Sequence, residues 1–141
     1  MNEKKTNVLL IGDNCHDAKL IKEILLESNS ANFYVTHVEK LSKGLIALEK
    51  NNFDVVILDL ALPDCIGLET FRKVRSKLPW VPIIVLTGST KSRTDVKKCI
   101  DGAQSYLLKG YIDKISLPMR IFEAIEEQRA LRAINLHFVK T

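Results

Sequence analysis

Four polar side chains that could carry out phosphoryl or metal chemistry stand at the ends of separate short apolar segments. Asp59 directly follows the unbroken apolar run at 55–58, and Asp13, Thr87 and Lys109 close or follow three other such segments. A short, β-branched apolar run bounded by polar residues predicts a strand buried on both faces. If these strands are parallel, their carboxyl ends meet at one edge, where open α/β sheets place their ligand crevice.

The residue types at this edge suit a phosphoryl group and a hard cation. Two carboxylates and nearby loop carbonyls favour Mg²⁺, and a carboxylate can attack phosphorus to give an aspartyl phosphate. A metal ion and an ammonium group would neutralise the phosphoryl oxygens. Taken singly, Asp59 could cap a loop, Thr87 could be a strand-end hydroxyl, and Lys109 could be a solvated lysine. Their joint placement at four strand ends favours the functional interpretation.

The elements that would position these side chains alternate regularly along the chain. Strands are expected at 7–11, 33–38, 55–58, 82–87 and 105–108, and helices at about 16–28, 41–51, 68–78, 89–101 and from 116 onward. Five strands and five helices joined by short connections predict a parallel sheet with helices on both faces. Asn14 or Asp17 could cap the first helix. A helical period continues to Phe138, beyond the end expected for a compact domain.

Composition limits the class of protein. The chain has 141 residues, 46% apolar and 27% charged, with a net charge of +4, which fits one globular domain. Its three cysteines form no CxxC pair, so we expect a reducing, cytoplasmic location. The N-terminal apolar run is too short for a signal peptide, and no stretch approaches the ~20 apolar residues of a membrane span. We therefore expect no membrane partner.

Four segments together resemble one known family. LLIGDNCHDAKLI, VVILDLALPDCIGLE, VPIIVLTGS and GAQSYLLKG are similar to the motifs of the receiver domain of two-component response regulators. The resemblance extends from about Asn7 to Gln128. It implies an α/β, flavodoxin-like (CheY-like) doubly wound (βα)5 fold with strand order 2-1-3-4-5. The chain then divides into a receiver domain at 1–128 and an extension of the last helix at 129–141.

The resemblance also implies a role for each candidate residue. Asp59 would be the phosphoacceptor and would take a phosphoryl group from a sensor histidine kinase or a phosphotransfer protein. Asp13, Asp59 and the backbone carbonyl of Ala61 would bind Mg²⁺. Lys109 would pair with the phosphoryl oxygens, and Thr87 would follow the phosphoryl group as a switch residue.

The resemblance and the residue count together predict the partners. Tyr106 occupies the family's aromatic switch position, and the face formed by the helix at 89–101, the strand at 105–108 and the last helix resembles its signalling surface. A downstream protein target is expected there. A homodimer through the last helix is a further hypothesis. Direct DNA binding is not expected, because the five βα units leave no residues for a helix-turn-helix.

Two departures from the family pattern leave an alternative open. Gly12 stands where the family usually has an acid, which should weaken Mg²⁺ binding, and Gly110 stands where a cis-proline often follows the lysine. The alternative is a degenerate receiver that binds a partner without phosphorylation. An enzyme is not expected, since no G-x-G-x-x-G or Walker glycine loop is present and Ala61 occupies the place of a phosphatase's second acid.

Overall fold

The apolar runs form a five-stranded parallel sheet in a computed structural model that describes residues 5–88 and 105–140. Its strands are β1 (Lys5–Ile11), β2 (Asn32–Val38), β3 (Val55–Asp59), β6 (Ile83–Thr87) and β7 (Ser105–Leu108). They pair in the order β2-β1-β3-β6-β7, and every pair is parallel. Counted as five main strands, this is the order 2-1-3-4-5, so the predicted flavodoxin-like fold is confirmed.

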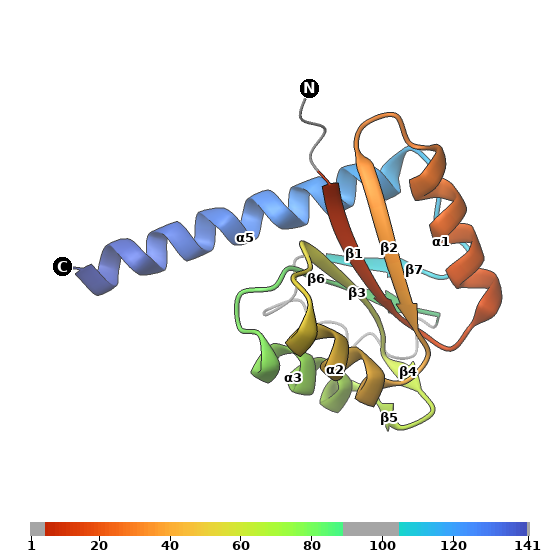
Figure 1. The fold of residues 1–141 in the computed structure, drawn as a ribbon, viewed down its shortest axis with the longest axis horizontal. Helices are drawn as coiled ribbons and strands as arrows, with labels where there is room; N and C mark the ends of the chain where they lie inside the picture. The colour runs from red at the N-terminus through yellow and green to blue at the C-terminus, as the bar shows by residue number, and fades with distance from the viewer. Residues whose placement is uncertain (1–4, 89–104, 141) are drawn as a thin grey trace.

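Helices cover both faces of the sheet (Figure 1). They are α1 (Cys15–Glu27), α2 (Leu41–Lys50), α3 (Leu68–Lys77) and α5 (Ser116–Lys140). Successive strand side chains point to opposite faces. Val8 and Leu10 therefore lie in a core cluster with α1 and α5, whereas Leu9 and Ile11 lie in a second cluster with α2 and α3. The predicted burial of β3 on both faces is confirmed.

One pair of strands was not predicted. β4 (Ala61–Leu62) and β5 (Cys65–Ile66) form a small antiparallel hairpin, in a segment for which neither a strand nor a helix was predicted. Each strand has two residues, too few to produce a recognisable alternation of apolar and polar side chains. The hairpin follows Asp59 and leads into α3. The helix predicted at 89–101 lies outside the described residues.

Side chains from the loops fix where two helices begin. The Asn14 side chain accepts hydrogen bonds from the backbone N–H of His16 and Asp17, so Asn14 caps α1. The N-cap residue of α2 provides no such bond. Instead, the carboxylate of Asp64 in the β4–β5 turn accepts from two backbone N–H groups of the first turn of α2. This cap joins the hairpin after Asp59 to the body of the protein.

The last helix is longer than the sheet needs. α5 packs its first half on the sheet and continues past the body of the molecule (Figure 1). Phe122 lies against Phe33 with ring centroids 5.7 Å apart, and farther along Arg132 lies over Trp80. The division of the chain at residue 128 stays a prediction. Among the described residues, no helix is long and apolar enough to cross a membrane.

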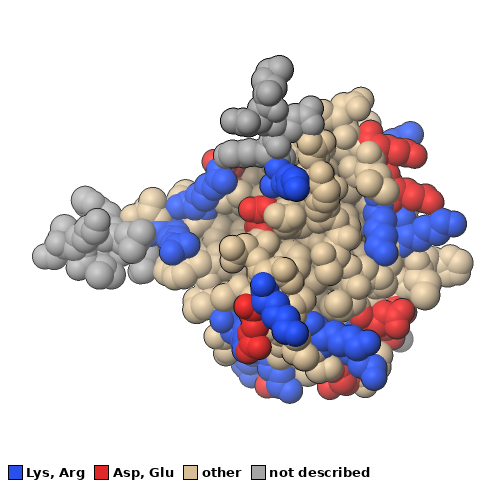
Figure 2. Space-filling model, viewed as in Figure 1, with Lys and Arg blue, Asp and Glu red and all other residues tan. Residues whose placement is uncertain are grey.

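Charged side chains are mixed over the visible surface. In Figure 2, Lys and Arg side chains lie among Asp and Glu side chains on the same face. One pair, Lys77 with Glu49, joins α3 to α2, and its Lys77 ammonium lowers the pKa of the Glu49 carboxyl. The cytoplasmic location stays a prediction.

Candidate functional site

The carboxyl edge of the sheet brings Asp59 and Lys109 together. Lys109 directly follows β7, and its Nζ lies 2.7 Å from Oδ2 of Asp59, the last residue of β3. Neighbouring β6 separates the two strands, so the lysine side chain reaches across one strand. This contact joins residues that lie far apart in sequence.

The Asp59 carboxylate is almost completely buried. Asp59 is 2% exposed, and its Oδ1 accepts a hydrogen bond of 2.9 Å from the backbone N–H of Ala61. An ionised carboxylate out of contact with water is unstable unless charge or hydrogen bonds compensate it. Here the Lys109 ammonium and the Ala61 N–H compensate it. The arrangement therefore keeps a nucleophilic oxygen pair at the end of a rigid strand.

Thr87 lies between these two residues in the sheet. It ends β6, is 6% exposed, and its backbone carbonyl accepts from the N–H of Lys109 at 2.9 Å. Gly88 follows, and a Cβ there would lie 3.2 Å from Cδ of Lys109. The absence of a side chain at Gly88 therefore leaves Lys109 room to extend toward Asp59.

Asp13 lies at the same edge in the turn after β1 and is exposed. That turn is held by two bonds: the N–H of Gly12 donates to the carbonyl of Val38, and Nε2 of His37 donates to the carbonyl of Gly12 at 2.7 Å. The predicted convergence of Asp13 with Asp59 on one metal ion stays a prediction. Residue 12 does face Asp59, because a Cβ on Gly12 would lie 3.8 Å from Oδ2 of Asp59.

A third acid near Lys109 was not among the predicted site residues. Asp17, in the first turn of α1, has its Oδ2 3.8 Å from Nζ of Lys109, and its side chain is 19% exposed. Asp17 was considered only as a helix cap. Its distance from Lys109 depends on how α1 packs beside the sheet, and no pattern in the sequence reports that. The contact of His37 with the Gly12 carbonyl was not predicted either, because it also depends on how neighbouring elements pack.

The donor set fits a magnesium ion. Among the described residues, Oδ2 of Asp17 is buried and accepts no hydrogen bond, and Oδ2 of Asp59 has the Lys109 ammonium as its charged partner. A carboxylate oxygen can accept more than one partner, so each has capacity for a cation or a water bound to one. Within 5–88 and 105–140, no three His, Cys, Asp or Glu side chains converge on one metal position. Mg²⁺ needs only one or two carboxylates besides water and phosphate oxygens. The Ala61 carbonyl as a ligand stays a prediction.

Tyr106, in β7, is 40% exposed. Its backbone carbonyl accepts a bond of 3.3 Å from Nη1 of Arg120 in α5. The aromatic side chain is thus available at the surface on the sheet edge formed by the last strand. Its role as a switch stays a prediction. Gly110, two residues past β7, has φ +89°, a conformation that favours glycine.

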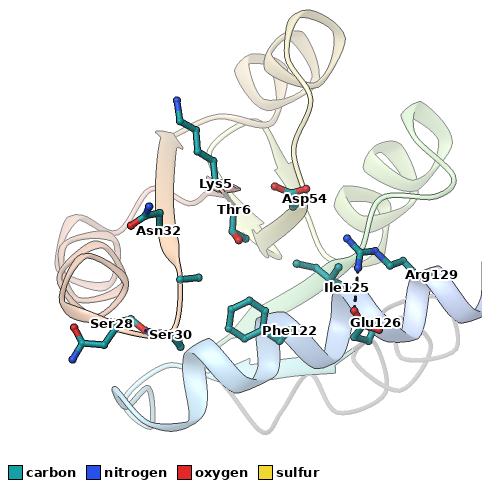
Figure 3. Close-up of a pocket in the computed structure, with 12 residues that line it drawn as sticks. Lys5, Thr6, Ser28, Ser30, Asn32, Asp54, Phe122, Ile125, Glu126 and Arg129 are labelled. Carbon is teal, nitrogen blue, oxygen red and sulfur yellow. Dashed lines mark hydrogen bonds and ion pairs between the residues drawn. The ribbon is translucent and has the colours of Figure 1, made fainter. Parts of the chain in front are cut away.

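A separate cavity of about 680 Å³ lies at the opposite edge of the sheet (Figure 3). It is lined near the starts of β1 and β2 and by one face of α5. Its charged groups have partners: Asp54 accepts from the N–H of Asn7, and Arg129 pairs with Glu126. The cavity therefore takes no part in the arrangement around Asp59.

Comparison with known proteins gives consistent results. The sequence model of the response regulator receiver domain matches residues 8–122. The cell cycle transcriptional regulator CtrA of Caulobacter vibrioides is 35% identical over 104 residues, which are 74% of this chain and 44% of CtrA. The transcriptional regulatory protein GlrR of Escherichia coli K12 is 30% identical over 127 residues, 90% of this chain and 28% of GlrR. This chain therefore spans less than half the length of these two relatives.

Solved structures share the fold. A response regulator receiver domain protein from Clostridium thermocellum superposes with a TM-score of 0.75 at 27% identity, covering 89% of this chain and 98% of that one. The receiver domain of the sensor histidine kinase PA1611 from Pseudomonas aeruginosa, with a magnesium ion in its active-site cleft, gives 0.73 at 23% identity and covers 87% and 99%.

These relatives correct the predicted partners. CtrA and GlrR are transcriptional regulators, so the prediction that excluded direct DNA binding is wrong. It rested on the count of residues in the βα units. That count describes only the segment that matches, and the matched segment is a minor part of each regulator.

Proposed function

Because the chain belongs to the response regulator receiver domain family, we propose that it is a phosphorylation switch with Asp59 as the phosphoacceptor. The observation that carries this proposal is the 2.7 Å contact between Nζ of Lys109 and Oδ2 of a carboxylate that is otherwise buried. Receiver domains are in general signalling modules, and the output of this one would be a change in partner affinity and no chemical product released from a substrate.

The reaction proposed is transfer of a phosphoryl group from a phosphohistidine of a histidine kinase or phosphotransfer protein. A carboxylate oxygen of Asp59 attacks phosphorus, an O–P bond forms, and the N–P bond to the imidazole breaks. The bonding electrons leave with the imidazole nitrogen, which ends as neutral histidine. The product is a mixed anhydride between carboxyl and phosphate.

Residues of this chain would hold the developing charge. The Lys109 ammonium lies where it can neutralise a phosphoryl oxygen, and the Ala61 N–H keeps the carboxylate oriented. Asp13 and Asp59, with the Ala61 carbonyl, would hold Mg²⁺, which would supply further neutralisation of the phosphoryl oxygens. Fixed groups of this kind lower the barrier because they need no rearrangement during transfer.

The switch would follow from the new position of charge. A phosphoryl group on Asp59 gives Lys109 a more highly charged partner and offers an acceptor to the Thr87 hydroxyl. Thr87 ends β6 and Lys109 directly follows β7, the strand paired with it, so a shift of either residue would be passed to β7 and to Tyr106. Such a local electrostatic change can bias two conformations with different partner affinities.

The test is phosphorylation by a small phosphodonor with Mg²⁺, followed by intact-protein mass spectrometry. One phosphoryl group should be gained, and the gain should require both Mg²⁺ and Asp59. Asp59→Asn should abolish it. Asp54→Asn, directly before the other end of the same strand, is the matched control and should leave it unchanged.

A second candidate function is favoured by Gly12, which removes one acid from the carboxyl edge. In that case the chain is a partner-binding module that works without phosphorylation. No mass gain at saturating Mg²⁺ and phosphodonor would support this module and contradict the switch.

A further inference from the structure

Asp17 is an acid to which the resemblance to the family assigns no role. The Asn14 cap fixes the first turn of α1 by accepting from the N–H of Asp17 at 3.0 Å. That turn directs the Asp17 side chain toward the carboxyl edge of the sheet, where Oδ2 lies 3.8 Å from Nζ of Lys109. Oδ2 is buried and accepts no hydrogen bond among the described residues. A buried carboxylate oxygen in this state depends on a nearby positive charge.

Lys109 is the cation that both acids share. Its Nζ is 2.7 Å from Asp59 and 3.8 Å from Asp17. Two carboxylates on one ammonium leave the group as a whole negative, and the exposed Asp13 at the same edge adds a further negative charge. An excess of negative charge at a set of oxygen ligands is what attracts a divalent cation.

Gly12 marks the place from which such charge is missing. A Cβ at residue 12 would meet Cβ of Asp59 at 3.5 Å and Oδ2 of Asp59 at 3.8 Å, both ordinary contacts. An acid at this position would therefore fit and would lie against the Asp59 carboxylate. Asp17 approaches the same carboxylate–ammonium pair from α1.

We propose that the Asp17 carboxylate supplies the negative charge that an acid in place of Gly12 would supply. Asp17 is a positioning residue that holds the Lys109 amine at Asp59. Its negative charge would also stabilise Mg²⁺ through a bound water molecule. This inference rests on the proposed function, since it concerns the metal and the lysine of that reaction. It also explains how a receiver with a single acid after β1 keeps a charge balance suited to Mg²⁺.

The first experiment is calorimetric titration of the full chain with Mg²⁺ alone. Asp17→Asn should weaken Mg²⁺ binding by ~10-fold, the scale measured for groups that act on a metal through its ligands. Gly12→Asp added to Asp17→Asn should restore the affinity, because it returns a carboxylate to the same pair. The control Glu23→Gln removes an exposed acid from the same helix and should bind Mg²⁺ as the unaltered chain does.

Two results of this titration would overturn the proposal. Asp17→Asn could bind Mg²⁺ like the unaltered chain, or Gly12→Asp could fail to restore what Asp17→Asn loses. The first result would mean that Asp17 does not contribute to Mg²⁺ binding. The second would mean that its loss acts through structure and not through charge.

A second measurement separates this inference from the proposed function. A double-mutant cycle on Asp17→Asn and Lys109→Met, followed by urea unfolding without metal, should give a stabilising coupling. The pair Glu23→Gln and Lys109→Met should give none. If the unaltered chain takes up neither Mg²⁺ nor phosphate, the proposed function fails. In that case the coupling energy between Asp17 and Lys109 still tests whether Asp17 positions Lys109. A coupling energy of zero would overturn that role as well.

Discussion

Replacing Lys109 by methionine isolates the ion pair at the centre of the candidate site. Methionine has similar length and no charge, so the change removes the ammonium while keeping most of the apolar side chain that lies under Gly88. The Asp59 carboxylate would then keep one hydrogen bond, from the N–H of Ala61. We expect the folded state to lose stability because a buried charge loses its compensating partner.

The size of the loss follows from the geometry. Two unit charges at the 2.7 Å observed between Nζ of Lys109 and Oδ2 of Asp59 attract by about 6 kcal/mol at an effective dielectric constant near 20. Lys109 keeps 24% of its side chain exposed, so water can partly replace it, and breaking a buried pair costs ~3–5 kcal/mol. We therefore expect a loss of about 2–3 kcal/mol, below the fully buried case. With a urea m-value of ~2 kcal/mol/M, the midpoint should fall by about 1–1.5 M.

Urea unfolding followed by circular dichroism, without metal, measures this loss. Lys77→Met is the matched control, because Lys77 pairs with Glu49 on the surface and exposed pairs contribute little to stability. In an Asp59→Asn background, Lys109→Met should cost less than in the unaltered chain, because the only carboxylate among the described residues that then loses the Lys109 ammonium is Asp17, which is 3.8 Å away and partly exposed. An equal cost of Lys109→Met in the unaltered chain and in the Asp59→Asn background would refute the reasoning, because Lys109 would then not stabilise the fold through Asp59.

Two further predictions concern the elements around the site. Gly44→Ala places a Cβ 2.9 Å from Cγ1 of the fully buried Ile11. Overpacking costs ~1–3 kcal/mol against a helix-propensity gain of ~1 kcal/mol, so thermal unfolding should show a net loss of stability that Ile11→Val partly relieves. A stabilised Gly44→Ala variant would contradict this packing. The pKa of Asp64 is lowered by hydrogen bonds from the backbone N–H groups of Ser42 and Leu41. A carboxyl whose pKa is lower in the folded state stabilises the fold above its unfolded pKa of about 3.9 and loses that effect as pH falls through the folded value. Asp64→Asn should therefore lower the urea midpoint at pH 7, and the difference from the unaltered chain should shrink below about pH 4; a difference independent of pH would exclude the carboxylate as the cap of α2.

Local features of the sequence predicted the strands because burial on both faces demands continuous apolar runs. Val55–Leu58 could be recognised for this reason, and the observed β3 ends at Asp59 as the pattern indicates. The hairpin of β4 and β5 could not be recognised, since its pairing depends on backbone contacts between segments of two residues. Of the two cap candidates for α1, only the observed hydrogen bonds select Asn14 over Asp17.

The candidate site divides in the same way. The residue types at the ends of parallel strands were enough to group Asp59, Thr87 and Lys109, because strand polarity alone brings such ends to one edge. The contacts of Asp17 and His37 were out of reach, because each depends on how a neighbouring element packs against β1 and its turn. Apolar periodicity and strand order are therefore encoded locally in this chain. Distances between charged groups on different elements arise only when the two cores on either side of the sheet fix those elements in place.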